Sequence, residues 1–89
     1  MKHYTYEELC TFVEQQLKAN VDVLYCRSRG SKSNVIRPFI KLQEPICYET
    51  YWHGGPLTFQ KGDYIHADPQ DVYGLTAETF ARCYVDAQV

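Results

Sequence analysis

The sequence predicts an α+β fold, in which an antiparallel sheet of about five strands carries an N-terminal and a C-terminal helix packed on it. Three observations predict this class. The first segment, up to Asn20, has the periodicity of an amphipathic helix; residues 21–75 change to the pattern of strands; and a second capped helical pattern follows Thr76. With 89 residues, the chain has room for a single domain, residues 1–89.

The N-terminal helix has a start signal, an apolar stripe and a stop signal. Thr5 and Glu8 have the spacing of a capping box, in which each side chain accepts a hydrogen bond from the other residue's backbone N–H. We expect the helix to end at Asn20. The stripe, at the spacing of one helix face, consists of Leu9, Phe12, Val13, Gln16 and Leu17.

Strand-like runs rich in β-branched and aromatic residues fill the middle of the chain. They are residues 21–27, 35–43, 46–53, 57–60, 64–67 and 72–75. Pro38 has no N–H for a ladder hydrogen bond, so we expect residues 35–43 to form an edge strand or one that starts late. Gly62 can take the positive φ of a tight turn, which predicts a hairpin joining residues 57–60 to 64–67.

The run 46–53 has two faces, and one of them is expected to point into the core. Because neighbours along a strand alternate, Tyr51 and Trp52 cannot share a face. We expect Tyr48 and Trp52 to point inside, and Tyr51 and His53 to point outside, where an exposed aromatic side chain is a good interface anchor. The alternative is that helices cover both faces within the molecule.

The C-terminal helix starts after Thr76, whose hydroxyl is placed to cap it. Its expected buried stripe consists of Ala77, Phe80, Ala81 and Tyr84. The polar segment from Asp68 to Asp71 precedes it as a turn.

Composition narrows the classes of function. The net charge of −2 gives no global signal for nucleic-acid binding. No apolar run is long enough to span a bilayer and no targeting segment is seen near Met1, so we expect a cytoplasmic protein without a membrane partner. The four cysteines stand singly and not in C-x-x-C pairs, which favours thiols over disulfides or zinc.

Catalytic signals are missing from the sequence. His53 and His66 could face each other on neighbouring strands, but no further ligand pattern supports a metal. The serines lie in no nucleophile elbow, and Gly54-Gly55 precedes a strand and not a helix, so it is no phosphate cradle. We therefore expect no enzyme activity, no catalytic residue, no metal and no cofactor.

The C-terminal third resembles a family. Its matching residues are Lys61, Gly62, Asp63, Tyr64, Ile65, Tyr73, Gly74, Phe80 and Tyr84. This segment, residues 57–85, resembles the "GDY-hydrophobic … F-x-x-x-Y" ending of small bacteriophage and prophage accessory proteins of mostly unassigned function. The resemblance implies a phage-type origin and a place in the bacterial host cytoplasm. It also implies an inhibitor that binds a host or defence complex, such as a CRISPR complex.

Two charged regions are candidate binding sites. Residues 27–37 contain only positive charges, Arg27, Arg29, Lys32 and Arg37, which could follow a phosphate backbone or simply keep a loop soluble. The C-terminal part is acidic, and its Asp68 and Asp71 could face a basic partner or simply form a turn.

Three functions remain open at this level. The favoured one is a non-enzymatic, anti-defence inhibitor that binds a host or defence protein complex through Arg27, Arg29, Lys32, Arg37, Tyr51, His53, Asp68 and Asp71. The alternatives are a nucleic-acid-binding regulator that uses residues 27–37, and a binder that sequesters a nucleotide signal. A homodimer is compatible with each of them.

Overall fold

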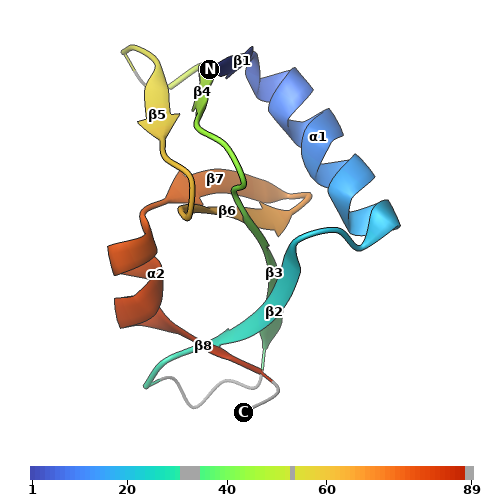
Figure 1. Ribbon diagram of the computed structural model, residues 1–89, viewed down its shortest axis with the longest axis vertical. Coiled ribbons are helices and arrows are strands. Elements are labelled where there is room, and N and C mark those ends of the chain that lie inside the picture. Colours follow the sequence, from blue (N-terminus) through green and yellow to red (C-terminus); the bar gives the residue numbers. More distant parts are fainter. Residues whose placement is uncertain (31–34, 53, 88–89) are drawn as a thin grey trace.

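Two helices and two sheets make up the part of the chain that the structure describes, residues 1–30, 35–52 and 54–87 of a computed structural model (Figure 1). The elements in chain order are β1 (Lys2–Tyr4), α1 (Tyr6–Ala19), β2 (Val23–Ser28), β3 (Ile36–Lys41), β4 (Ile46–Tyr48), β5 (Leu57–Phe59), β6 (Tyr64–Asp68), β7 (Asp71–Leu75), α2 (Ala77–Cys83) and β8 (Tyr84–Asp86). The expected α+β class, with a helix near each end of the chain, is confirmed.

The main sheet has five antiparallel strands in the order β7-β6-β3-β2-β8. It is strongly curved, and α2 connects its two edge strands, β7 and β8, across the concave side (Figure 1). The other helix, α1, lies on the opposite, convex side. The two helices therefore cover different faces of the same sheet.

The second sheet has three strands in the order β1-β4-β5. β1 runs parallel to β4, with His3 opposite Cys47, and β5 is antiparallel to β4. Since β1 leads directly into α1, this pairing brings the residues that follow β4 next to the start of the helix. The Glu49 N–H continues the contact by donating to the Tyr4 carbonyl at 3.1 Å.

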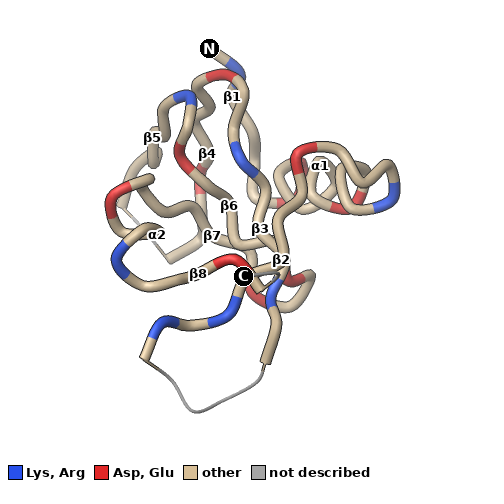
Figure 2. The backbone as a smooth tube through the Cα atoms, turned by 60° about the horizontal axis from the view of Figure 1, so that its bottom comes forward, with Lys and Arg blue, Asp and Glu red and all other residues tan. Residues whose placement is uncertain are grey.

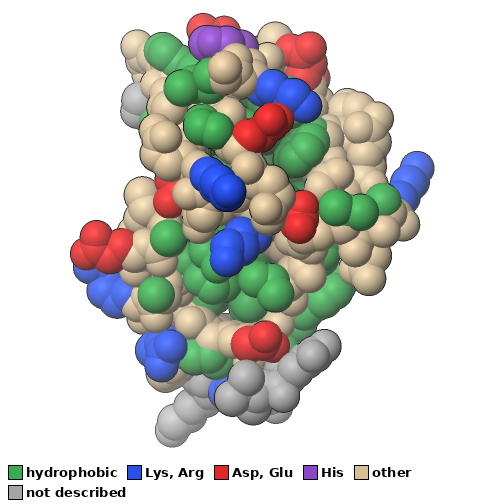
Figure 3. Space-filling model, in the orientation of Figure 1, with side chains coloured by type: hydrophobic (Ala, Val, Ile, Leu, Met, Phe, Trp, Pro, Cys, Tyr) green, Lys and Arg blue, Asp and Glu red, His purple; other side chains and the backbone are tan. Residues whose placement is uncertain are grey.

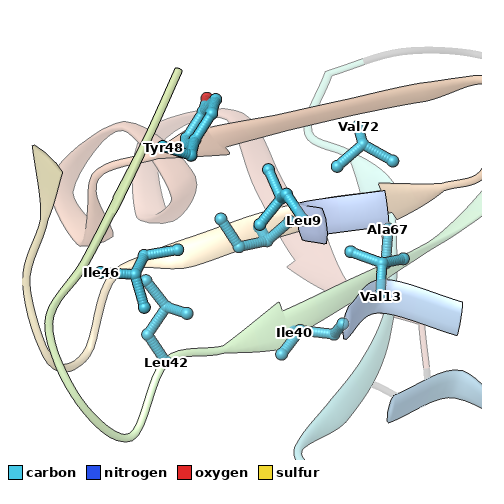
Figure 4. Close-up of a cluster of buried hydrophobic side chains, with 9 residues drawn as sticks. Leu9, Val13, Ile40, Leu42, Ile46, Tyr48, Ala67 and Val72 are labelled. Atoms are coloured by element: carbon cyan, nitrogen blue, oxygen red, sulfur yellow. The ribbon is translucent and has the colours of Figure 1, made fainter. Parts of the chain in front are cut away.

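The larger core lies between α1 and the convex face of the main sheet (Figure 4). Leu9 and Val13, one turn apart on α1, are fully buried there. Their neighbours from the strands and from the second sheet are Ile40, Leu42, Ile46, Tyr48, Ile65, Ala67 and Val72. This contact uses part of the stripe that the sequence predicted for α1, and Phe12 and Leu17 pack at its margin.

The smaller core, on the concave face, is mostly aromatic. Phe39 is fully buried and contacts Phe80 and Tyr84, with ring centroids 5.1 Å and 4.6 Å away. His66 packs beside it at 5.1 Å and donates from Nδ1 to the Asp71 carbonyl at 2.6 Å. Figure 3 shows hydrophobic side chains filling the space that the sheet and α2 enclose.

The ends of both helices follow the sequence signals. Thr5 and Glu8 form the capping box at the start of α1, at 2.9 Å and 3.1 Å. Asn20 ends the helix in the left-handed conformation, with φ at 53°. Thr76 caps α2 by accepting from the Thr79 N–H at 3.2 Å.

Of the two alternatives for residues 35–43, the edge strand is wrong, whereas a late start is what the β6 side shows, because pairing there begins only at Phe39. β3 lies inside the sheet, with β2 on one side and β6 on the other. Pro38 is tolerated because the pairing with β6 covers only Phe39 to Lys41, so Pro38 faces a partner, Tyr25, on the β2 side alone.

The predicted hairpin of residues 57–60 and 64–67 is also wrong, although its turn is present. Gly62 has the expected positive φ, 91°. Asp63 accepts from the Gln60 N–H at 2.8 Å and from the Ala77 N–H at 2.9 Å, so its carboxylate ties the turn to the start of α2. The strands on either side of the turn belong to different sheets, because β5 pairs with β4 and β6 pairs with β3 and β7.

Two burial expectations fail as well. The run 46–53 is a strand only as far as Tyr48, because both its partner strands are three residues long, so Trp52 is 68% exposed and not inside. In α2, Ala77 and Ala81 are exposed, and the short helix packs through Phe80. The sequence reading also missed β1 and β8.

Candidate partner-binding surface

The predicted basic residues gather at one end of the molecule. Arg27 and Arg29 follow one another at the end of β2, and Arg37 lies near the start of β3; in Figure 2 blue segments stand on both sides of the grey trace. The strand register places Arg27 opposite Ile36 and Arg37 opposite Cys26, so these two arginines leave opposite faces of the sheet. The Arg29 guanidinium donates to the Tyr84 carbonyl at 3.5 Å. Lys32 lies outside the described residues.

The predicted acidic residues sit in the β6–β7 hairpin. Asp68 has a local role, since its carboxylate accepts from the Gln70 N–H at 3.0 Å. Asp71 is exposed and lies close enough to Tyr6 to act on it electrostatically. The pKa of the Tyr6 hydroxyl is raised, first by burial and then by the neighbouring Cys10 and Asp71. That hydroxyl donates to the Val72 carbonyl at 3.2 Å, which holds the start of α1 against β7.

Tyr6 also supports the exposed aromatic pair, Tyr51 and Trp52. The ring of Trp52 meets Tyr6 edge-on, with centroids 5.1 Å apart and an interplanar angle of 74°. Tyr51 does the same at 6.5 Å and 64°. These two side chains are nevertheless 77% (Tyr51) and 68% (Trp52) exposed. Tyr51 is therefore outside, as expected; the other residue expected there, His53, lies outside the described part.

A pocket of about 470 Å³ opens beside this pair, and we call it the Tyr6–Tyr51 pocket. Its lining is Thr5, Tyr6, Glu7, Glu49, Thr50, Tyr51 and Gly55. Two of these residues are aromatic and two are carboxylates. A smaller hollow of about 270 Å³ adjoins it, shares Thr5 and Glu49, and adds Glu8 and His3.

The pocket carries a net negative charge. Glu8 is engaged in the capping box, whereas the side chains of Glu7 and Glu49 are exposed, and neither is in an ion pair among the described residues. The end of α1 opposes them with an N-terminal macrodipole worth roughly half a positive charge. Two full carboxylate charges outweigh that half charge, so the pocket favours a cation.

Sequence reasoning missed most of this site. Tyr6, Glu7 and Glu49 are not among the residues that the sequence predicts for a binding site. Glu7 and Glu49 lie close together because β1 pairs with β4 in parallel, and no local sequence pattern predicts that pairing. The sequence does contain one signal for the exposure of Trp52. Gly54-Gly55-Pro56 indicates that the strand ends here, so its alternation of buried and exposed side chains does not continue.

The described residues offer little reactive chemistry. Among them, no three His, Cys, Asp or Glu side chains come together as a metal site. Burial raises the pKa of the Cys26 thiol, which makes it a poor nucleophile. No helix in residues 1–30, 35–52 or 54–87 is long and apolar enough to cross a membrane.

Comparisons with known proteins add no relative. No family model matches this chain, and no curated protein or solved structure matches it either.

Proposed function

We propose that this protein is a non-enzymatic binder that docks on a host or defence protein complex of a bacterium and blocks it. One observation carries the proposal: Tyr51 and Trp52 stand side by side in solvent, ordered against Tyr6. Tyr and Trp are enriched at the energetic centres of protein interfaces, because their large rings gain much from being covered. A partner that covers both rings buries apolar surface that the fold leaves exposed to solvent.

Two further observations support a protein partner. The carboxylate-lined pocket beside the aromatic pair favours a basic partner surface over the phosphates of a nucleotide signal. The likeness of residues 57–85 to small phage accessory proteins is the reason for naming a host or defence complex. An anti-defence inhibitor of this kind needs no catalytic group, only a surface that competes for its target.

The test is a double substitution at the aromatic pair. Tagged protein is used to capture partners from bacterial lysate, the recovered complex is purified, and its affinity and activity are measured with each variant. Tyr51→Ala/Trp52→Ala should weaken binding by 2 kcal/mol or more, about 30-fold, as expected for centrally placed aromatic residues. It should also relieve inhibition of the complex.

The matched control is Val21→Ala, which truncates an exposed apolar side chain between α1 and β2 that belongs neither to the aromatic pair nor to the charged regions. It should leave the affinity unchanged. Failure to recover any stoichiometric partner in repeated captures, or a partner bound equally well by the double variant, would count against the proposal.

Nucleic-acid binding is the second candidate, and one observation favours it. Tyr25 and Arg27 leave the same face of β2, both exposed, which places a stacking ring next to a cation. Arg27→Glu/Arg29→Glu should then abolish binding of single-stranded DNA or RNA in a fluorescence anisotropy titration at low salt. If the unmodified protein binds neither nucleic acid there, this candidate is excluded.

A further inference from the structure

We infer that the Tyr6–Tyr51 pocket receives the side chain of one arginine of the partner protein. This inference rests on the proposed function and deepens it, because it names the group that the binder recognises. The pocket volume of about 470 Å³ is within the range of small-ligand sites, and suits one long side chain. The aromatic pair then covers the surface around that side chain.

The walls match a guanidinium group. Tyr6 and Tyr51 meet at an interplanar angle of 64° and line the pocket together, so they form an aromatic corner. A guanidinium is flat, stacks on aromatic faces and directs its N–H groups outward in its own plane. Carboxylates at the rim, from Glu7 and Glu49, are the acceptors that such N–H groups pair with best.

Charge excludes the other classes of occupant. A phosphate or carboxylate would meet two like charges, opposed only by the helix end. An apolar side chain would take Glu7 and Glu49 partly out of water without giving them a partner, which is costly. Among the described residues that line the pocket, none is Lys or Arg, so none of these supplies a positive charge to the two carboxylates.

Arginine is favoured over lysine by the same geometry. A lysine ammonium is a compact, strongly hydrated point charge, whereas the guanidinium is weakly hydrated and can contact a ring and a carboxylate at once. The pocket offers both kinds of group within one cavity.

A short peptide provides a direct test. The probe is acetyl-Gly-Arg-Gly-amide, and its control is the same peptide with citrulline, which is neutral and has the same shape. The only tryptophan of the chain, Trp52, contacts Tyr6 and reports binding by its fluorescence. We expect the arginine peptide to bind with a Kd of about 1 mM, near −4 kcal/mol, and to weaken as salt is added. The citrulline peptide should bind at least 10-fold more weakly.

Substitutions locate the binding. Glu7→Gln/Glu49→Gln should lower the affinity for the arginine peptide at least 10-fold, and Tyr51→Ala should do so too. Glu14→Gln is the matched control, since it removes an exposed carboxylate from α1 that lines none of the hollows around the pocket. Thermal melts of each variant show that the fold is kept. Equal binding of both peptides, no binding of either, or unchanged affinity of the Glu7/Glu49 variant would overturn the inference.

The purified partner complex separates this inference from the proposed function. If the double aromatic variant loses the partner while the Glu7→Gln/Glu49→Gln variant binds it as tightly as the unmodified protein, the arginine inference is wrong and the proposed function stands. Loss of affinity in both variants, with Glu14→Gln unaffected, supports both.

Discussion

Gly74 shows how one residue holds the two sheets together. A Cβ at this position would collide with the ring of Phe59, so β5 can lie against β7 only because the side chain is missing. The Gly74 N–H, on the edge strand β7, donates to the buried Tyr48 hydroxyl at 2.9 Å. The second sheet is thus attached to the main one through a packing contact and a hydrogen bond at the same residue.

Gly74→Ala should therefore destabilise the fold by about 1–3 kcal/mol, the usual cost of forcing extra volume into a packed contact. Urea denaturation measures the change. Gly54→Ala is the control, because nothing lies within 4 Å of a Cβ placed there. Equal urea midpoints for the Gly74 and Gly54 variants would show that Phe59 moves aside without cost.

At the scale of the elements, α1 depends on its start. The capping box satisfies the first backbone N–H groups and fixes the point where the chain leaves β1. Because Thr5 and Glu7 also line the Tyr6–Tyr51 pocket, the first turn of this helix shapes the proposed binding site.

Thr5→Ala should lower the free energy of unfolding by about 1 kcal/mol, the typical effect of losing an N-cap side chain. For a domain of this size such a change lowers Tm by roughly 4–8 °C. Thr11→Ala, in the middle of the same helix, is the control and should leave Tm unchanged or raise it, because alanine has the higher helix propensity. An unchanged Tm for Thr5→Ala would mean that water or another side chain replaces the cap.

The elements also show what the sequence could predict and what it could not. Signals that act within a few residues succeeded: the Thr5 and Thr76 caps, the Asn20 stop and the Gly62 turn. Signals that depend on distant partners failed. β1 and β8 are three residues long and gain their structure only by pairing with β4 and β2.

The same contrast between local signals and distant partners applies to the candidate site. The exposure of Tyr51 was predicted, although the strand alternation behind that prediction ends at the buried Tyr48. The contributions of Glu7 and Glu49 could not be predicted, since they meet across two elements whose parallel register is a tertiary property. Trp52 was misplaced because the strand pattern was extended beyond the end of its partners.

The arginines of β2 and β3 and the carboxylates of the Tyr6–Tyr51 pocket lie towards different ends of the molecule. In Figure 1 the end of β2 and the start of β3, which carry Arg27 and Arg37, lie at the bottom, and the start of α1 lies at the top beside β4. The longest extent of the molecule is 34 Å, several times the screening length of physiological salt, about 8 Å. The two ends therefore act on a partner as separate regions.

The buried Tyr48 and the half-buried Tyr64 and Tyr73 should make the fold sensitive to alkali. Burial raises the pKa of Tyr48, Tyr64 and Tyr73 above the ordinary value of 10.0, so the folded protein holds these protons more tightly than the unfolded chain. The contribution of these protonated tyrosines to the free energy of unfolding is fully present below pH 10.0. It is lost as the pH rises through the folded-state pKa values.

Urea midpoints measured at neutral pH and at steps above 10 should therefore fall, with tyrosinate absorbance appearing together with unfolding. A Tyr73→Phe variant should lose less stability over the same steps. A midpoint that stays constant through this range would mean that these hydroxyls reach water in the folded state.

The position of β8 has a consequence for how the protein is made. Cys26 pairs with Asp86, so the outer edge of β2 stays unpaired until β8 has been synthesised. Until then, β2 is an edge strand with unpaired backbone N–H and C=O groups, to which a strand of another chain could pair. The outer edge of β2 is protected from such mispairing only when α2 and β8 have folded and β8 lies along it.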